Sequence, residues 1–406
     1  MQGWMIALIV VAAFIALVAI AFLAGMLIFV HAILGRRKEL SEQAGQKKGY
    51  TADKFGVDPV WFDFAEKTTS QATITAYDGV KLGARIIRQS EPTGRVAVLC
   101  HGYGATLRST QVQAKLFYDR GFDVYMLAMR GHKGSGGKVG MAWIDRFDLS
   151  RWIDRIVTDY GEQVQIALFG VSMGGSTVVA YAGMEPKPQV KCVIDDCGFS
   201  TQYDEYIACL KAARLPKCSI HLFNAGVKLV HGYSLYDADI TKLAASMTCP
   251  ALFFHGTADD FVPFDLGQKL FDSCASPEKS FVAIDGAGHA CAYITDKEKY
   301  VSAFTEFIDA HIEGSQLVHE PSEYTDYLAA LEAERQAKQE QEQQAEERAE
   351  QATSEQEQEE SETPAEQAAE SVTPAEQEAT EPAEENATPD APATEETPEP
   401  TAALDD

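Results

Sequence analysis

A serine between glycines is the clearest chemical signal in this sequence of 406 residues. The apolar run Ile166–Phe169 leads directly into Gly170-Val171-Ser172-Met173-Gly174, and a helical stretch follows. A sharp turn from a strand into a helix holds such a serine in a strained conformation, and the helix N-terminus favours negative charge beside it. G-x-S-x-G arises by chance in roughly one chain in ten of this length. The prediction that Ser172 is a nucleophile therefore depends on its strand–turn–helix context.

A second apolar run, Val96–Cys100, ends in His101-Gly102-Tyr103-Gly104. Attack on a carbonyl needs two backbone donors aimed at the oxygen that becomes negative. We expect the N–H groups of Tyr103 and Met173 to form this oxyanion hole. An ordinary glycine turn after a strand would have the same sequence, but the serine motif downstream favours the functional interpretation.

A serine nucleophile also needs a general base and a carboxylate that orients the base. His289 follows the apolar run Phe281–Ile284 in a glycine-containing loop, which suits a mobile base better than the positions of the other histidines. Each candidate for the acid could instead be a helix cap or a turn residue, so the residues alone leave this choice open. The candidates, all placed after apolar runs, are Asp195, Asp196, Asp259 and Asp260.

Short apolar runs alternate with longer amphipathic stretches, which predicts an α/β domain at residues 60–314 with a mostly parallel sheet flanked by helices. Asp78-Gly79 predicts an antiparallel hairpin at the sheet edge. The stretch 198–247 is too long and irregular for a plain crossover, so we predict an inserted cap over the active site. The predicted strands are Gln71–Ala76, Lys81–Arg88, Val96–Cys100, Val124–Met129, Ile166–Phe169, Val190–Ile194, Ala251–Phe254 and Ser280–Ile284. The predicted helices are Thr110–Arg120, Phe147–Tyr160, Ser176–Gly183 and Asp296–His311.

The chain ends differ from this region in composition. Residues 4–34 contain no Asp, Glu, Lys or Arg, and this length exceeds the roughly 20 apolar residues that span a bilayer. A signal peptide would begin with basic residues and have a shorter apolar run, so we predict an uncleaved transmembrane anchor, followed by a juxtamembrane linker at 35–59. Residues 315–406 form an acidic tail. Its stretch 321–406 has 27 acidic and 3 basic residues, a net charge of 3 − 27 = −24 against −27 for the whole chain.

The tail has no aromatic residue after Tyr327, so we predict that it is partly helical and then disordered, a solvated spacer whose binding partner is left open. Basic residues cluster just after the apolar segment, which places the following domain in the cytoplasm by the positive-inside rule. If the domain is exported instead, Cys209 and Cys218 are the pair to test for a disulfide. The lack of a basic excess argues against nucleic acid as a partner. The basic cluster is Arg36, Arg37, Lys38, Lys47 and Lys48.

Taken together, these motifs resemble the α/β-hydrolase superfamily over residues 70–312. More narrowly, G-V-S-M-G-G, D-D-C-G and H-G-T-A-D-D-F-V-P resemble membrane-anchored bacterial hydrolases with serine-aminopeptidase-like or dienelactone-hydrolase-like domains. The resemblance implies that the acid is Asp259, the fifth residue of H-G-x-x-D, and the order Ser172, Asp259, His289 is the order of that fold. One departure is Ala128-Met129-Arg130-Gly131-His132-Lys133-Gly134-Ser135, where relatives commonly have D-x-R-G-H-G-x-S.

The expected function is therefore a serine hydrolase that cleaves an ester, thioester or amide through an acyl-enzyme, with a small-molecule, acyl or peptide substrate. This chemistry requires no metal and no organic cofactor. Two alternatives from other classes use the same residues: an acyltransferase whose acceptor is not water, and a noncatalytic binding module tethered to the membrane. A complete Ser172, Asp259 and His289 set argues against the binding module.

Overall fold

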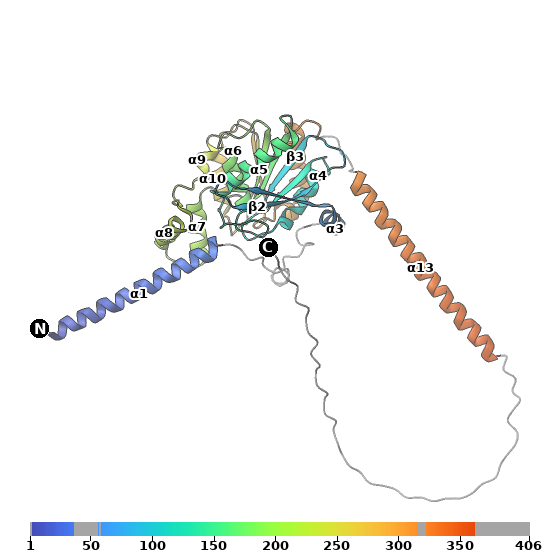
Figure 1. The fold of residues 1–406 in the computed structure, drawn as a ribbon, viewed down its shortest axis with the longest axis horizontal. Helices are drawn as coiled ribbons and strands as arrows, with labels where there is room; N and C mark the ends of the chain where they lie inside the picture. Colours follow the sequence, from blue (N-terminus) through green and yellow to red (C-terminus); the bar gives the residue numbers. More distant parts are fainter. Residues whose placement is uncertain (1, 36–55, 57, 316–321, 362–406) are drawn as a thin grey trace, which may run out of the picture. The chain divides into compact units, whose positions relative to one another are not determined.

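An eight-stranded sheet organises the domain (Figure 1). The computed structural model describes residues 2–35, 56, 58–315 and 322–361. The order across the sheet is β1-β2-β4-β3-β5-β6-β7-β8, with β2 antiparallel to both β1 and β4 and all other neighbours parallel. This confirms the predicted α/β sheet with an antiparallel edge. The strands are β1 Ser70–Thr75, β2 Lys81–Ile87, β3 Arg95–Cys100, β4 Asp123–Leu127, β5 Gln165–Val171, β6 Val190–Asp196, β7 Ala251–Gly256 and β8 Lys279–Ile284.

The helices fall mainly between the strands, as the alternating pattern predicts. Two strands are shorter than predicted. The strand β2 ends at Ile87, and β4 ends at Leu127, where the chain turns and the Met129 N–H donates to His101 Nε2 at 3.1 Å. The helices are α1 Gln2–Leu34, α3 Pro59–Thr68, η2 Leu107–Thr110, α4 Gln111–Tyr118, α5 Asp145–Tyr160, α6 Met173–Ala182, α7 Gln202–Ala212, α8 Ser219–His231, α9 Ile240–Ala244, α10 Phe264–Ser273, α11 Ala292–Thr295, α12 Lys297–His311 and α13 Ser322–Ser361.

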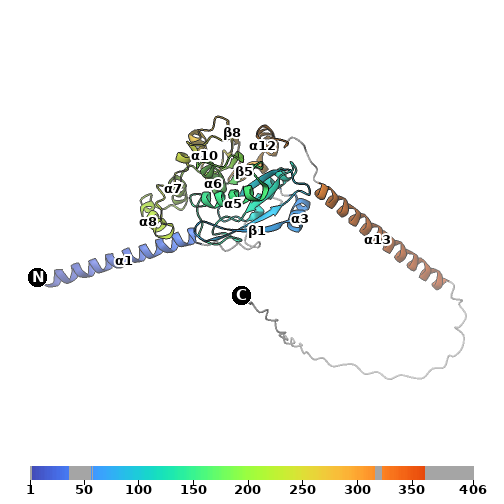
Figure 2. The same cartoon turned by 45° about the horizontal axis from the view of Figure 1, so that its top comes forward.

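Both faces of the sheet are buried, each under its own hydrophobic cluster. Side chains alternate along β3: Val96, Val98 and Cys100 join one cluster, whereas Ala97 and Leu99 join the other. The first cluster includes residues of α5 and α6, which lie side by side in Figures 1 and 2, and the second includes residues of α3, α4 and α12. Burial on both faces explains why the central strands are continuous apolar runs.

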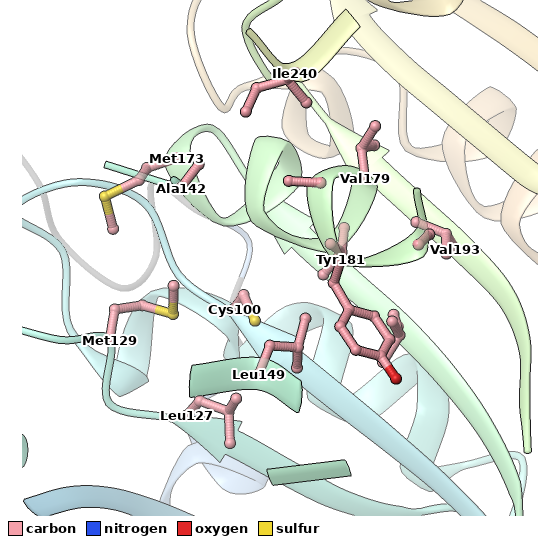
Figure 3. Packing of buried hydrophobic residues seen from close by; sticks show 14 of the residues in the cluster. Cys100, Leu127, Met129, Ala142, Leu149, Met173, Val179, Tyr181, Val193 and Ile240 are labelled. Atoms are coloured by element: carbon pink, nitrogen blue, oxygen red, sulfur yellow. The ribbon is translucent and has the colours of Figure 1, made fainter. Parts of the chain in front are cut away.

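Figure 3 shows the first cluster around α6. Val179 and Tyr181 of α6 and Cys100 of β3 are among its buried members, and Met173 lies where the helix begins. The start of α6 is therefore held against the carboxyl end of the sheet by apolar packing.

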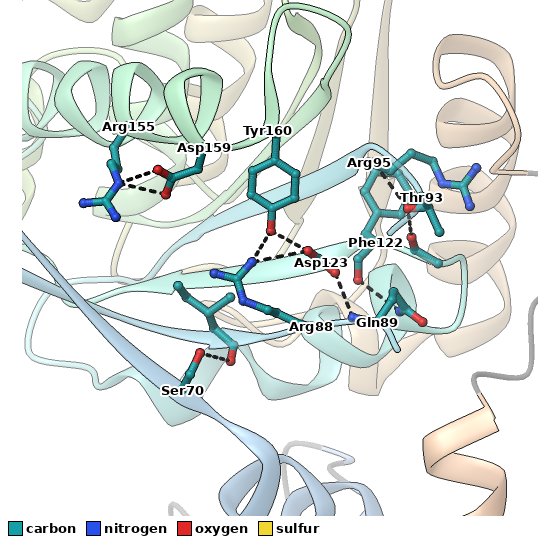
Figure 4. Close-up of polar contacts among 12 residues, drawn as sticks. Ser70, Arg88, Gln89, Thr93, Arg95, Phe122, Asp123, Arg155, Asp159 and Tyr160 are labelled. Carbon is teal, nitrogen blue, oxygen red and sulfur yellow. Dashed lines mark hydrogen bonds and ion pairs between the residues drawn. The ribbon is translucent and has the colours of Figure 1, made fainter. Parts of the chain in front are cut away.

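A polar network ties together the opposite, amino end of β4 (Figure 4). Asp123, the first residue of β4, accepts a hydrogen bond from the Gln89 N–H at 2.8 Å and another from the Tyr160 hydroxyl. The guanidinium of Arg88 donates to Tyr160 at 2.5 Å. This network joins the end of α5 to the amino end of β4, whereas Ser172 lies at the carboxyl end of the sheet.

The helix α1 contains the predicted anchor. Within it, Gly3–Gly25 has a mean hydropathy of 3.2, and among the described residues it is the one helix long and apolar enough to cross a membrane. A signal sequence near the N-terminus can also be long and apolar enough to meet this criterion. The predicted linker at 35–59 lies mostly outside the described residues, as does the acidic tail beyond residue 361.

Aromatic packing extends the folded unit past the predicted boundary at residue 314. Tyr324, in the first turns of α13, is buried against Trp61 and Phe64 of α3, with ring centroids 5.7 and 5.2 Å apart. The composition of residues 315–406 predicts that Tyr324 lies in a solvated tail. Its contact partners are more than 250 residues away along the chain, so no local pattern indicates them. Further along α13, residues 333–349 are exposed, as their charge and glutamine content predict.

Three helices occupy the stretch that was predicted to be a cap: α7, α8 and α9. The last of them, α9, packs closely on the end of α6. A Cβ at Gly183, the residue after α6, would lie only 2.1 Å from the Leu243 carbonyl oxygen of α9. The stretch thus combines the α7–α8 pair with a short helix that belongs to the layer over the sheet.

Candidate active site

Ser172 occupies the turn between β5 and α6 with φ +56° and ψ −119°. Its N–H donates to the carbonyl of Asp196 at 2.7 Å, and its own carbonyl accepts from the Ser176 N–H at 3.0 Å. A positive φ costs a non-glycine residue on the order of 1–3 kcal/mol and persists only where the surroundings enforce it. Ser172 is therefore held, buried, in the strained turn that its sequence context predicts.

Glycines make this turn sterically feasible. A Cβ at Gly170 would lie 2.1 Å from the Gly174 carbonyl oxygen, and a Cβ at Gly174 would lie 2.0 Å from the Cys100 carbonyl oxygen. Both obstacles are backbone atoms, so a side chain cannot be accommodated by a rotamer change. The two glycines let α6 start directly against the end of β3.

Replacing Gly174 with alanine should therefore destabilise the domain by at least the 1–3 kcal/mol typical of overpacking. The measurement is urea unfolding of the full chain in detergent. Gly288→Ala is the matched control, because a Cβ there meets nothing within 4 Å and should change stability little. Equal unfolding midpoints for the two variants would contradict this account of the turn.

The structure brings His289 between Ser172 and Asp259. The ring Nε2 lies 3.0 Å from the Ser172 hydroxyl oxygen, and Nδ1 lies 2.8 Å from Asp259 Oδ2. Because a carboxylate only accepts hydrogen bonds, Nδ1 carries the proton and Nε2 is left to accept from the serine. The His289 side chain is about one fifth exposed, whereas the Asp259 side chain is fully buried.

The loop after β7 fixes the orientation of Asp259. Its Oδ1 accepts the backbone N–H groups of Phe261 at 3.0 Å and Val262 at 2.9 Å, which leaves Oδ2 pointing at His289. His255 contributes to this loop by hydrogen-bonding the Val262 carbonyl oxygen through Nε2 at 2.9 Å. Two backbone N–H donors therefore hold the buried carboxylate in the geometry that orients an imidazole.

The other candidate acids have different partners. Asp260 is exposed. Asp195 accepts the Gly198 N–H at 2.9 Å and packs against Gly175, where a Cβ would lie 1.9 Å from its Oδ1. Asp196 accepts the Tyr300 hydroxyl at 2.9 Å, and burial raises its pKa to about 6 although this hydrogen bond lowers it. Of these four carboxylates, Asp259 is the one that bonds to His289.

The turn after β3 lies directly against the serine. A Cβ at Gly102 would be 3.3 Å from Ser172 Cβ, so the residue before Tyr103 touches the serine. Met173 is the first residue of α6, where an N–H has no partner within the helix. Gly102, the residue before the predicted donor Tyr103, and the predicted donor Met173 therefore lie beside the same serine.

His132 supports this turn from the loop that departs from the family pattern. Its Nε2 accepts the Gly104 N–H at 2.9 Å, while Nδ1 donates to the Arg130 carbonyl at 3.0 Å. Neighbouring His101 is fully buried, and burial lowers the pKa of its imidazole to about 3, so it stays neutral. Two neutral imidazoles thus link the turn after β3 to the loop after β4.

Arg130 is held by acids from outside its own loop. Its guanidinium bonds both oxygens of Asp148 on α5, at 2.7 and 2.6 Å, and pairs with Asp78 of the β1–β2 turn at 2.6 Å. Ser135, the last residue of the motif, donates to the Ala128 carbonyl at 2.6 Å. These contacts hold the loop in place although position 128 is alanine, where relatives commonly have an aspartate.

One group of residues within the described ranges has the chemistry of metal ligands: Cys197, Asp259 and His289, whose ligand atoms lie within 4.8 Å of one another. Burial raises the pKa of the Cys197 thiol well above its usual value, and the two other residues are already bonded to each other. The hydrogen bond between Asp259 and His289 is the arrangement that proton transfer requires. All eight cysteines, Cys209 and Cys218 included, are unpaired thiols.

Glu205 is a buried acid near the site that no sequence motif indicates. Glu205 of α7 is 3 % exposed, its Oε2 has no hydrogen-bond partner, and the Cys209 thiol lies 3.7 Å from its Oε1. Burial raises its pKa to about 8; the Cys209 contact opposes this and the Asp259 charge adds to it. No motif surrounds Glu205, so only the fold reveals its burial.

This pKa predicts a pH-dependent stability. The folded chain binds the Glu205 proton more tightly than the unfolded chain, so the wild-type stability due to this proton is lost as pH rises from about 4.5 to about 8. Glu205→Gln should be more stable than the wild type at pH 9, by on the order of a few kcal/mol, and should lose that advantage near pH 5. Urea unfolding at the two pH values measures this. A difference independent of pH would contradict the buried-acid account.

Comparisons with known proteins agree with this architecture. Residues 91–215 match the family model described as serine aminopeptidase, S33. The uncharacterized protein YqkD of Bacillus subtilis is 27% identical over 221 residues, which cover 53% of this chain and 72% of that protein. A monoacylglycerol lipase of Mycolicibacterium smegmatis is 23% identical over 282 residues, which cover 60% of this chain and 99% of the lipase.

Among solved structures, an esterase of Pyrococcus furiosus superposes with a TM-score of 0.51 at 18% sequence identity, covering 64% of this chain and 94% of the esterase. At this identity the likeness concerns the fold. The sheet order, the strand–turn–helix position of Ser172 and the family match agree with one another. The chain has the fold of the α/β hydrolases, and over residues 91–215 it is similar to the serine aminopeptidase family.

Proposed function

We propose that the chain is a serine hydrolase in which Ser172 is the nucleophile, His289 the general base and Asp259 the orienting acid. The observation that carries this proposal is the bridging position of His289, 3.0 Å from the Ser172 hydroxyl oxygen and 2.8 Å from Asp259 Oδ2. These distances are within the reach that proton transfer requires. The neutral tautomer imposed by Asp259 leaves Nε2 ready to accept the hydroxyl proton.

In the first half-reaction, His289 takes the Ser172 proton while the serine oxygen bonds to the substrate carbonyl carbon. The carbonyl oxygen becomes an anion, and the N–H groups of Tyr103 and Met173 stabilise it. The imidazolium then protonates the leaving alcohol, thiol or amine as its bond to carbon breaks, which leaves an acyl-enzyme. In the second half, water gives His289 a proton and attacks the acyl carbon. Collapse of this intermediate returns the proton to Ser172 and releases the acid.

The substrate class we propose is a carboxylic ester. Support comes from two similar proteins, one called an esterase and one a monoacylglycerol lipase. The test is a series of chromogenic esters of increasing acyl length, run beside aminoacyl amides of the serine-aminopeptidase type. Faster turnover of the aminoacyl amides would replace the ester with a peptide substrate. An added alcohol acceptor that diverts the acyl group from water would instead identify an acyltransferase.

We further propose that α1 is retained as a single-pass anchor and that the domain lies on the cytoplasmic side. The apolar length of α1 and the basic residues that follow it support this orientation. Protease added to intact cells should leave the domain uncut, and lysis should expose it. Cleavage in intact cells would reverse the assignment of side, and a mature chain lacking residues 1–34 would identify α1 as a signal sequence.

A further inference from the structure

The α7–α8 pair carries a basic and apolar surface. The segment Lys211–Tyr236 has four Lys or Arg residues and no Asp or Glu, whereas residues 1–320 together have a net charge of −3. Figures 1 and 2 show α7 and α8 side by side at one edge of the domain. We call the following exposed residues the cap surface: Lys211, Arg214, Leu215, Lys217, Lys228 and Leu229.

The tip between the two helices is entirely exposed. Eight consecutive residues, Lys211–Cys218, are exposed, and they join the end of α7 to the start of α8. Arg214 has φ +56°, and the Leu215 N–H donates to the Leu210 carbonyl at 2.9 Å. This turn leaves the Leu215 side chain 42% exposed between basic neighbours.

The outer face of α8 continues this surface. Its exposed residues His221, Ala225, Lys228 and Leu229 are three, four or one positions apart and therefore share one face of the helix. Leu229 is 74% exposed. The opposite face carries the buried residues Ile220, Phe223 and Val227, which belong to the first hydrophobic cluster.

Packing beneath this surface holds it in place. Tyr206 of α7 and Phe223 of α8 are both buried, with ring centroids 4.4 Å apart. The Tyr236 hydroxyl hydrogen-bonds His221 Nδ1 at 2.9 Å, which ties the chain after α8 back to the exposed face of that helix. An exposed leucine on a well-packed helix therefore does not reflect a loose element.

We propose that the cap surface binds the headgroup region of an anionic lipid bilayer. Lys and Arg side chains are attracted to an anionic membrane surface, and exposed leucines beside them enter the acyl boundary. Charge alone would also suit the acidic tail of this chain, but that tail offers no aromatic residue after Tyr327 to cover Leu215 and Leu229. A helix of membrane-spanning length in the same chain also favours the lipid surface.

Binding to vesicles does not by itself test this proposal, because α1 alone can hold the chain on vesicles. The experiment therefore measures contact between the cap surface and the lipid. Cys218 is the exposed cysteine of the eight, and it lies at the tip. An environment-sensitive fluorophore is attached there in the full chain, with Cys209 and Cys291 replaced by alanine. The protein is reconstituted in vesicles of phosphatidylcholine alone or of phosphatidylcholine with phosphatidylglycerol. We expect blue-shifted, brighter emission only with phosphatidylglycerol, and loss of the shift at about 1 M salt.

Matched variants test the role of the surface. Lys211→Glu with Lys217→Glu should abolish the emission shift, and Leu229→Gln should reduce it. Lys191→Glu with Lys297→Glu is the control: it makes the same charge change at the start of β6 and on α12 and should leave the shift intact.

Two outcomes would overturn the proposal. The first is equal emission in both kinds of vesicle whatever the charge at positions 211 and 217. The second is a shift that appears only after residues 362–406 are deleted, which would make the acidic tail the occupant of the surface. Because the readout requires no turnover, the experiment can be run with Ser172→Ala, and its result is independent of the proposed hydrolase activity.

Discussion

Replacing Ser172 with alanine should lower kcat/KM for the best ester by a factor on the order of 10⁵ to 10⁶, the loss typical when such a nucleophile is removed. Alanine lacks the oxygen that lies 3.0 Å from His289 Nε2, so no acyl-enzyme can form. Backbone donors and substrate binding would remain, and they account for a residual rate above that of water. The measurement is the initial rate of ester hydrolysis by purified full-length protein.

Ser109→Ala is the matched control for that substitution. Ser109 is exposed in the turn before α4 and bonds only within that turn, to the Thr106 carbonyl at 2.7 Å. Its removal should leave the rate near that of the wild type. If Ser172→Ala has the same unfolding midpoint as the wild type and hydrolyses the ester at the same rate, Ser172 is not the nucleophile.

Asp259→Asn should lower kcat by about 10⁴ with a smaller change in KM. An asparagine amide placed toward His289 Nδ1 donates a hydrogen bond, which favours the tautomer with its proton on Nε2. That nitrogen then cannot accept the Ser172 proton. The buried amide would also fail to stabilise the imidazolium that forms during the reaction.

Asp260→Asn provides a sharp control, because it makes the same chemical change one residue away. Asp260 is exposed, and its neighbour holds the bond to His289. Its substitution should alter kcat by less than a factor of about three, as surface changes generally do. A larger loss in Asp260→Asn than in Asp259→Asn would reverse the assignment of the acid.

Local signals in the sequence predict most of the sheet and two residues of the candidate site. Ser172 is recognisable because strand, turn and helix follow one another within a dozen residues, and His289 because it follows the last apolar run. The acid was different. Asp259 and Asp260 have the same neighbours, and only resemblance to a family chose between them. The structure separates them physically, because backbone N–H groups of residues 261 and 262 orient Asp259 inward.

Contacts between distant segments were beyond sequence reasoning. Arg130 pairs with Asp78 and Asp148, which lie 52 and 18 residues away, so a missing acid at position 128 gave no hint of its partners. Tyr324 looked like part of a solvated tail until its packing on Trp61 was visible. In both cases the residue type permits either environment, and the fold decides which one it has.

The central claim is that Ser172 is the nucleophile, and a covalent probe tests it most directly. Full-length protein is treated with a fluorophosphonate, which reacts with an activated serine, and the modified peptide is identified by mass spectrometry. The account predicts one adduct, on Ser172, that is strongly reduced in Asp259→Asn and unchanged in Asp260→Asn. An adduct on a different residue, or hydrolysis of the best ester at full rate with Ser172 replaced by alanine, would contradict it.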